Sequence, residues 1–288
     1  MIEDGIMGNR QVDITEIRNT VKDLSIEANT VLRSDVLEAI QGFYDRESNA
    51  SAKNMLKVLI TNAALAREKQ LALCQDTGMV AVFIDIGKDV SITGGNITDA
   101  VNDGVKEAYS KGHFRKSVVN DPILRDNTGT NTPAVVHIDI VDGDKVGISV
   151  MPKGFGAENK GTLAMLEPTA GCERIIDFCV ETVKAAGPDA CPPYVLGVGI
   201  GGTMEKCAML AKKALLRPLD QANPQPHIAK LENEIKEKVN ALKIGIMGLG
   251  GISTVMGVAV ETAPTHIAGL PVAVNLSCHA LRSASRIL

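Results

Sequence analysis

The sequence has no tryptophan and only 3% aromatic residues, although 45% of its 288 residues are hydrophobic. Its core must therefore be built mainly from aliphatic side chains and alanine. No run of about 18 apolar residues occurs, so no transmembrane helix is expected. Positive charge is not in excess either, since the formal net charge is −4. A nucleic-acid partner is therefore not expected, whereas a small anionic substrate held by a few local arginines is compatible with this balance.

Dense cysteine spacing is also lacking, because the six cysteines are spread along the whole chain. The segment Met1-Ile2-Glu3-Asp4 is acidic and lacks the basic and apolar regions of a signal peptide. We therefore expect a cytoplasmic protein whose cysteines are reduced thiols or metal ligands rather than disulfides.

Apolar periodicity predicts an α+β fold whose first part, about residues 1–70, is largely helical. Ile14, Ile17, Val21 and Leu24 recur at helical spacing, with Asp13 as a candidate cap, and a second helical pattern begins near residue 55. A mixed α/β core should follow. We see no internal repeat and no convincing linker, so residues 1–288 are expected to form a single domain.

The core pattern predicts strands at 79–86, 135–141, 146–150 and 195–202. The second and third of these flank Asp142-Gly143-Asp144, which predicts a hairpin. Helices are expected at 171–186, 203–216 and, with an amphipathic pattern, 228–242. The stretch 245–256 is rich in glycine and methionine and is expected to be mostly loop.

Three cysteines stand in unusual settings. Cys74 opens Cys-Gln-Asp-Thr-Gly, Cys191 precedes two prolines that stiffen its loop, and Cys278 ends an apolar stretch. Three such thiols could converge on one soft metal centre and leave one coordination position free for a substrate. A polar turn is the alternative interpretation of the first motif, and a zinc site is the alternative use of the thiols. Cysteines at 172, 179 and 207 lie in expected helices, where packing as small hydrophobic residues is favoured.

Other candidates depend more on where the fold places them. Arg115 is a surface cation unless its loop faces the thiols, where it could clamp a carboxylate. His266 has an apolar neighbourhood that favours a core histidine, although it lies only twelve residues before Cys278. The glycine-rich segment 153–159 favours close approach of backbone amides to a small anion. The runs 197–202 and 245–251 lack the acidic residue of a dinucleotide site.

Together, these motifs resemble the α subunit of a two-subunit class I (iron–sulfur) fumarate hydratase, within the fumarase and L-tartrate dehydratase family. The resemblance covers the chain from about Val31 to its end. It rests on Cys-Gln-Asp-Thr-Gly at 74–78, Asn-Thr-Gly-x-Asn-Thr-Pro at 127–133, Ala-Cys-Pro-Pro at 190–193 with Gly-Val-Gly-Ile-Gly-Gly at 197–202, and His-Ile-Ala-Gly-Leu-Pro-Val-Ala-Val at 266–274.

This resemblance implies one cluster-binding domain that holds a [4Fe–4S] cluster with an open fourth iron. The implied cluster ligands are Cys74, Cys191 and Cys278. The implied substrate pocket is lined by Gln75, Arg115 and a main-chain group near Gly156, and the candidate catalytic residues are Asp76 and His266. The family's other catalytic groups come from a β subunit, so an α₂β₂ heteromer is expected.

The implied activity is that of a hydro-lyase, a carbon–oxygen lyase that reversibly dehydrates a 2-hydroxy dicarboxylate, first of all (S)-malate to fumarate, as in the tricarboxylic acid cycle. One loop departs from the family pattern Lys-Gly-Gly-Gly-Ser-x-Asn, because residues 153–159 carry Phe155 and Ala157 in place of a glycine and the serine. L-Tartrate and a methyl-substituted malate are therefore alternative substrates. A zinc-binding protein without catalytic activity is the alternative from another class.

Overall fold

The computed structural model describes residues 10–288, so the acidic start of the chain lies outside the described residues. The chain forms two compact units. Unit 1 comprises the described part of Met1–Asn29 together with Gln75–Pro152 and Ser283–Leu288, and unit 2 comprises Thr30–Cys74 and Lys153–Arg282. Neither unit is one contiguous segment, and the single domain over 1–288 stays a prediction.

The first part of the chain is helical, as predicted. It contains α1 (Ile14–Thr30), α2 (Ser34–Arg46) and α3 (Ala50–Lys69), preceded by the short strand β1 (Arg10–Asp13). Asp13 Oδ1 accepts a hydrogen bond of 2.8 Å from the Thr15 backbone N–H, so Asp13 caps α1. None of the helices within 10–288 is long and apolar enough to cross a membrane.

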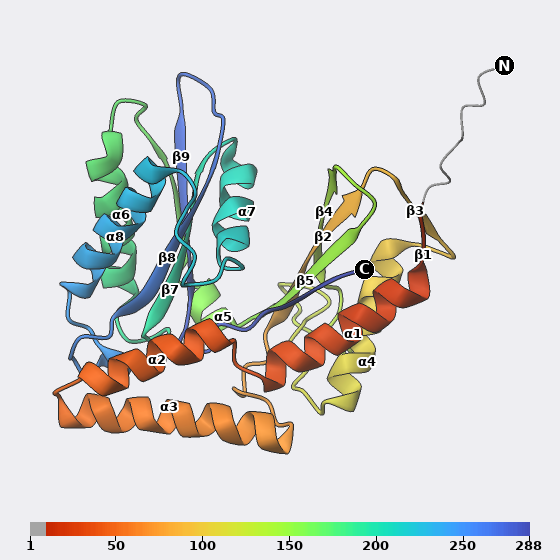
Figure 1. Ribbon diagram of the computed structural model, residues 1–288, viewed down its shortest axis with the longest axis horizontal. Coiled ribbons are helices and arrows are strands. Elements are labelled where there is room, and N and C mark those ends of the chain that lie inside the picture. Colours follow the sequence, from red (N-terminus) through yellow and green to blue (C-terminus); the bar gives the residue numbers. More distant parts are fainter. Residues whose placement is uncertain (1–9) are drawn as a thin grey trace. The chain divides into compact units, whose positions relative to one another are not determined.

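Unit 1 contains a four-stranded sheet in the order β10-β5-β2-β4 (Figure 1). These strands span Ala284–Ile287, Val146–Lys153, Met79–Gly87 and Val135–Val141, respectively. The short strand β3 (Val90–Thr93) pairs in parallel with β1, and α4 (Ile97–Lys111) lies beside α1. A Cβ atom on Gly104 of α4 would lie 2.6 Å from the Arg18 carbonyl oxygen, so a glycine is needed where these two helices meet.

The predicted hairpin is wrong, although both of its strands form. β2 lies between β4 and β5 in the sheet and pairs in parallel with β4. Residues 80–84 of β2 are all buried, whereas five of the seven residues of β4 are exposed. The more apolar strand therefore takes the central position and separates two strands that are adjacent in sequence. The mixture of helices and mixed sheets confirms the α+β class.

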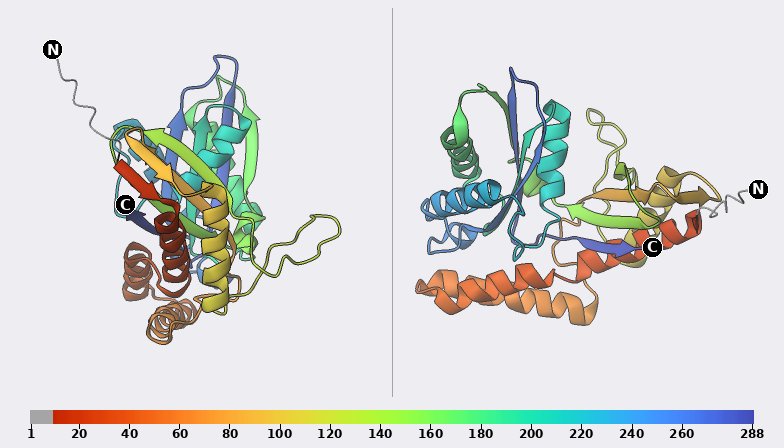
Figure 2. Two further views of the ribbon diagram at one scale, coloured as in Figure 1. Left: turned by 90° about the vertical axis from the view of Figure 1, so that its right-hand side faces the viewer. Right: turned by 45° about the horizontal axis from the view of Figure 1, so that its top comes forward.

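Unit 2 contains a second sheet, in the order β6-β9-β7-β8. The strands span Thr162–Leu166, Leu270–Ser277, Tyr194–Gly201 and Val255–Ala263, respectively. Helices α6 (Gly171–Ala186) and α8 (Pro226–Asn240) cover one face, and α7 (Met204–Ala214) covers the other (Figures 1 and 2). The remaining elements are the short helix α5 (Phe155–Glu158) and the 3₁₀ turn η1 (Ile246–Gly248).

The glycine-rich strand β7 packs directly against α7. Added Cβ atoms on Gly197 and Gly199 would lie 2.0 and 2.1 Å from the carbonyl oxygens of Ala211 and Cys207. The Cys207 thiol donates a hydrogen bond of 3.1 Å to the Gly199 carbonyl. These glycines therefore serve helix–sheet packing. Cys179 and Cys207 are buried, as expected. Cys172, at the start of α6, is exposed instead.

Candidate metal centre

Two of the three predicted ligands meet at one edge of the unit 2 sheet. Cys191 precedes β7 and Cys278 follows β9, and because these strands are antiparallel, both residues lie at the same edge. The backbone N–H of His279 donates a hydrogen bond of 3.2 Å to the Cys191 carbonyl oxygen, and His279 Nδ1 lies 3.2 Å from the same oxygen. The two cysteine loops are therefore joined directly.

The Cys191 loop is held in a fixed conformation. Cys191 has a φ of +56°, in the left-handed region that a residue with a Cβ atom seldom adopts. Its N–H donates to the Pro188 carbonyl at 3.1 Å, and the N–H of Met247 donates to the Pro192 carbonyl at 3.0 Å. Gly248 lies against Pro188, where a Cβ atom would come within 2.7 Å of the proline ring. The glycine-rich turn around η1 thus supports this loop.

Cys74 lies in the bend after α3, in the same unit. Its neighbour Leu73 accepts a hydrogen bond of 2.9 Å from Asn62 Nδ2, which joins the bend to the middle of α3. Burial raises the pKa of Cys191, and the thiols of Cys278 and Cys74 raise it further. Burial also raises the pKa of Cys278; Arg282 opposes this effect and Cys74 adds to it.

The donor set consists of three thiols, and soft thiolate ligands suit zinc as well as iron–sulfur clusters. Within residues 10–288, no group of three or more histidine, cysteine, aspartate or glutamate side chains lies close enough to hold a metal ion. The three thiols therefore fit an iron–sulfur cluster by their chemistry.

Unit 2 also contains a buried cation. Lys153, the last residue of β5, is only 4% exposed. Its Nζ lies 3.2 Å from Glu158 Oε2, yet it meets no hydrogen-bond acceptor in favourable geometry. Burial lowers the pKa of Lys153, although Glu158 and, more weakly, Cys278 act in the opposite direction. An ammonium group carries three donors, so this side chain has donors to offer an anion.

Glu158 joins the cation to the rest of unit 2. Its Oε1 accepts a hydrogen bond of 2.6 Å from Lys212 of α7, and its Oε2 accepts one of 3.1 Å from Asn275 Nδ2 of β9. Burial opposes ionisation of Glu158, but the two lysines and Asn275 outweigh it and lower its pKa to about 2. A small cavity of about 210 Å³ lies beside Glu158 and Asn275. The sequence analysis missed this network. Lys153 and Glu158 stand in a glycine-rich loop, and the sequence of such a loop does not show that its charged side chains are buried.

The remaining predicted residues of unit 2 differ in their placement. Gly156 belongs to α5 and is exposed, and a Cβ atom there would meet open space. His266 lies in the exposed connection between β8 and β9, where its Nδ1 accepts a 3.1 Å hydrogen bond from the Ala268 N–H. The eight residues of β9 separate it from Cys278, a strand length of about 26 Å. The expected core position of His266 is therefore wrong, and its catalytic role stays a prediction.

Gln75, Asp76 and Arg115 belong to unit 1, where the fold joins their two loops. The hydroxyl of Thr77 donates a hydrogen bond of 2.7 Å to the Arg115 carbonyl. Asp76 Oδ1 accepts a 3.0 Å hydrogen bond from the Gly78 N–H, which fixes the turn. Gln75 and Arg115 are exposed, and Asp76 is half-buried. The loop that carries Gln75 and Asp76 is therefore joined by a hydrogen bond to the loop that carries Arg115.

Two residues that the sequence did not single out hold these loops together. Asn131 is fully buried; its Oδ1 accepts a 2.7 Å hydrogen bond from the Ser117 N–H, and its Nδ2 donates one of 3.1 Å to the Gly78 carbonyl. The buried hydroxyl of Tyr109 donates to the Thr77 carbonyl. The Asn-Thr-Gly-x-Asn-Thr-Pro motif thus includes a structural brace, Asn131, which joins the Ser117 and Gly78 loops. The second asparagine of this motif was the feature of the sequence from which the brace could have been predicted.

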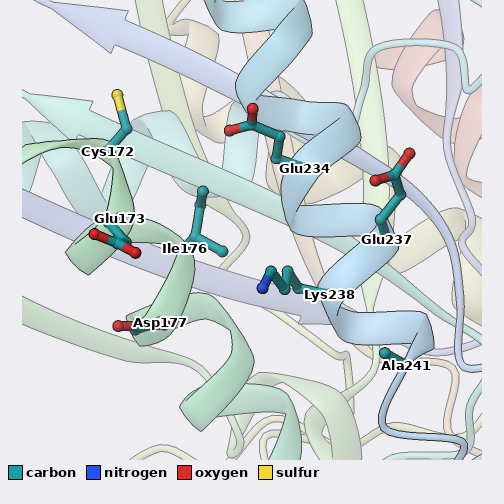
Figure 3. A pocket seen from close by; sticks show the side chains of 8 residues that line it. All are labelled: Cys172, Glu173, Ile176, Asp177, Glu234, Glu237, Lys238 and Ala241. Carbon is teal, nitrogen blue, oxygen red and sulfur yellow. The ribbon is translucent and has the colours of Figure 1, made fainter.

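A separate hollow lies between α6 and α8 (Figure 3). It encloses about 600 Å³ and is lined by four carboxylates, the exposed thiol and a lysine. The lining residues include Cys172, Glu173, Asp177, Glu234, Glu237 and Lys238. None of the predicted site residues lines it, so this hollow is distinct from the thiol site.

Comparison with known proteins supports the motif-based resemblance. Residues 18–286 match the family model described as fumarate hydratase (Fumerase). The chain is 41% identical over 275 residues to the putative L(+)-tartrate dehydratase subunit alpha of Methanocaldococcus jannaschii, covering 93% of this chain and 96% of that protein. It is 31% identical over 283 residues to the L(+)-tartrate dehydratase subunit alpha of Escherichia coli strain K12, covering 97% and 93% of the two chains.

Proposed function

Since this chain belongs to the fumarate hydratase family, we propose that it is the α subunit of an iron–sulfur hydro-lyase that reversibly dehydrates a 2-hydroxy dicarboxylate. The observation that supports the proposal is the joining of the Cys191 and Cys278 loops through the His279 N–H in unit 2, the unit to which Cys74 also belongs. These thiolates would hold a [4Fe–4S] cluster through three irons. When bound, the cluster supplies a Lewis acid at its open iron, which promotes departure of hydroxide.

The neighbouring side chains supply the remaining functions of an α subunit. Gln75 directly follows Cys74, so its amide can donate to a substrate carboxylate close to the cluster. In unit 1, Arg115 offers a guanidinium for bidentate binding of a substrate carboxylate. In unit 2, the backbone amides near Gly156 are the candidate donors to an anion. Asp76 is the candidate group for proton transfer to or from the substrate.

Lys153 fits the same site electrostatically. Three thiolates bring negative charge into a partly buried region, and the buried ammonium offsets it. Glu158 keeps the Lys153 side chain in place while Lys212 compensates the carboxylate in turn. In this arrangement the unused donors of Lys153 are available to sulfur atoms of the site.

The first candidate substrate is (S)-malate, with fumarate as the product. L-Tartrate is the second candidate, because the relatives in Methanocaldococcus jannaschii and Escherichia coli carry the name L(+)-tartrate dehydratase. Both substrates are 2-hydroxy dicarboxylates and require the same carboxylate donors. Phe155, which is exposed in α5, is the substitution in this loop that would alter the pocket next to Gly156.

We propose a β subunit as partner, in an α₂β₂ assembly, because these relatives are named as alpha subunits. The groups of this chain comprise one guanidinium and one carboxylate on the joined loops. A dicarboxylate needs more cationic contacts than these, which a partner would supply. Reduced thiols and an oxygen-sensitive cluster fit the cytoplasm.

The decisive test is the visible spectrum and the iron and sulfide content of the chain purified without oxygen. We expect a brown protein with about four irons and four sulfides per chain. Cys191→Ser should lose most of the iron, whereas Cys172→Ser, which alters an exposed cysteine outside the thiol site, should retain it. A colourless protein that binds zinc, or full iron content in Cys191→Ser, contradicts the proposal.

Activity is measured after the metal content, with a β subunit added. Loss of water from (S)-malate and from L-tartrate is followed in parallel with the cluster-loaded protein. We expect dehydration of at least one of these acids and loss of that activity in Cys191→Ser. A brown complex that acts on neither acid would support the proposed cluster and contradict the proposed substrate class.

A further inference from the structure

Glu47 is a charged residue in an almost fully buried position. It directly follows α2 in unit 2 and is only 4% exposed. Its Oε1 accepts a hydrogen bond of 2.9 Å from the Asn49 N–H, and its Oε2 accepts one of 2.9 Å from the Ile252 N–H. A buried carboxylate is costly unless hydrogen bonds compensate it. The two backbone donors therefore determine where this charge can lie.

The glycine-rich turn 245–251 approaches this carboxylate closely. A Cβ atom on Gly251 would lie 2.3 Å from Glu47 Oε2, so the approach requires a glycine. Gly251 also has a φ of +88°, which glycine adopts without strain. Asn49 provides a second link, because its Nδ2 donates a hydrogen bond of 3.0 Å to the Leu249 carbonyl oxygen. The turn, which lacks the features of a dinucleotide site, thus surrounds a carboxylate of its own chain.

Internal contacts make the turn one compact segment. The Leu249 N–H donates a hydrogen bond of 2.9 Å to the Ile246 carbonyl, and the Gly250 N–H donates one of 2.9 Å to the Ile244 carbonyl. A Cβ atom on Gly245 would lie 1.6 Å from the Gly250 carbonyl oxygen, so the two ends of the turn are in direct contact. A displacement of Leu249 therefore also displaces the residues that precede it.

These preceding residues contact the Cys191 loop on both sides of the cysteine. The Met247 N–H donates a hydrogen bond of 3.0 Å to the Pro192 carbonyl, and Gly248 packs against Pro188. Cys191 has a φ of +56°, a conformation that persists in a residue with a Cβ atom only where surrounding contacts impose it. The turn supplies such contacts before and after the thiol-bearing residue.

We propose that Glu47 is a positioning residue for Cys191. With Asn49, its carboxylate holds the glycine-rich turn against the Cys191 loop, and the turn keeps the thiol in the orientation that a cluster ligand needs. The proposal rests on the proposed function, in which Cys191 is a cluster ligand. Glu47 acts through residues 245–251 rather than by contact with the thiol.

Two substitutions break this link at different points. Glu47→Gln keeps the size of the side chain but presents an NH₂ group to one of the two backbone donors, which loses its acceptor. Asn49→Asp keeps the oxygen that caps α3, since aspartate caps as well as asparagine, and replaces the donor to Leu249 by an acceptor. Glu38→Gln is the matched control, because it makes the same chemical change at an exposed carboxylate of α2.

Amide hydrogen exchange of the full-length chain after removal of iron measures the link by itself. We expect exchange at Cys191 and Met247 to be at least about tenfold faster in Glu47→Gln than in wild type, because the lost hydrogen bond involved a charged group. Asn49→Asp should accelerate the same amides several-fold, and Glu38→Gln should not. Exchange at Val198, which is buried in the centre of β7, should stay unchanged. A general loss of stability would instead accelerate both regions equally.

Iron retention tests the consequence for the cluster. Iron loss to an anaerobic chelator should be several-fold faster in Glu47→Gln and Asn49→Asp than in wild type and Glu38→Gln. Unchanged exchange at Cys191 and Met247, or equal acceleration at Val198, overturns the positioning role. Faster exchange with unchanged iron loss also contradicts it.

The two measurements separate this proposal from the proposed function. A wild type that holds no iron contradicts the proposed function, and the exchange result alone then decides whether Glu47 holds the Cys191 loop. If Glu47→Gln does not fold, Asn49→Asp gives the deciding comparison, because it leaves the Glu47 carboxylate in place.

Discussion

Lys153 Nζ lies 3.2 Å from Glu158 Oε2, in an ion pair that is 4% exposed on the lysine side and 21% on the glutamate side. The same carboxylate binds Lys212 at 2.6 Å. Two cations thus contact one anion, which leaves a net positive charge on this cluster of three side chains. Breaking a buried pair by removing one partner leaves an uncompensated charge, so each member has a measurable role.

Acid titration should reveal the contribution of Glu158 to stability. Its pKa in the folded protein is about 2, against an ordinary value of 4.5. Because the folded pKa is the lower one, the stabilisation is present above about pH 4.5 and is lost as the pH falls towards 2. The contribution is at most roughly 3 kcal/mol, and the burial of Lys153 offsets part of it.

The measurement is urea unfolding of wild type and Glu158→Gln between pH 7 and pH 3. The wild type should be more stable at pH 7, and the difference should shrink as the pH falls. Glu181→Gln, at a carboxylate that is 62% exposed, serves as the control. A constant difference between wild type and Glu158→Gln across the series would refute the assigned pKa.

Removal of the buried cation should weaken cluster retention, if the proposed function holds. Lys153→Met keeps the aliphatic volume and leaves Glu158 paired with Lys212, so the fold is retained. We expect iron loss to an anaerobic chelator to be several-fold faster than in wild type. Lys212→Met removes the other cation and should change the rate much less. Equal rates in wild type and Lys153→Met would exclude the electrostatic role.

The packing of α7 on β7 predicts opposite effects for two glycine substitutions. In Gly199→Ala, the new methyl group would lie 2.1 Å from the Cys207 carbonyl oxygen, so we expect a loss of about 1–3 kcal/mol. In Gly42→Ala, within α2, the nearest atom is the end of the Arg46 side chain at 3.9 Å. Better helix propensity should then stabilise the protein by about 0.5–1 kcal/mol. Urea midpoints that move in the same direction would contradict this packing.

The brace at Asn131 should control the order of the Arg115 loop. Asn131→Ala leaves the Ser117 N–H and the Gly78 carbonyl without their partner and keeps a φ of +62°, so we expect a loss of roughly 3 kcal/mol. Amide hydrogen exchange over residues 113–119 should become faster. Asn127→Ala removes a more exposed contact to the Lys116 carbonyl and should cost less than about 1 kcal/mol. Equal losses in the two variants would contradict the brace.

Local sequence patterns predicted many of the elements. The helix expected at 171–186 is α6, with the same bounds, because its apolar spacing, its glycine and its proline all act locally. The strands at 79–86 and 135–141 were equally visible. Their partners were not, because strand pairing depends on which strand is apolar enough to occupy the centre of the sheet. The helix α4 was missed, since its small residues match those of α1 only once both helices are placed.

By itself, the sequence determined the α+β class, most helices, the three candidate thiols and the resemblance to the family. Tertiary structure decided which of these residues meet. Antiparallel pairing of β7 with β9 brings Cys191 and Cys278 to the same end of these two strands. His266 precedes β9 and therefore lies at the opposite end of that strand. The tertiary structure also decided that Lys153 and Glu158 form a largely buried ion pair. These outcomes depend on contacts between residues distant in sequence, whose energies no local pattern encodes.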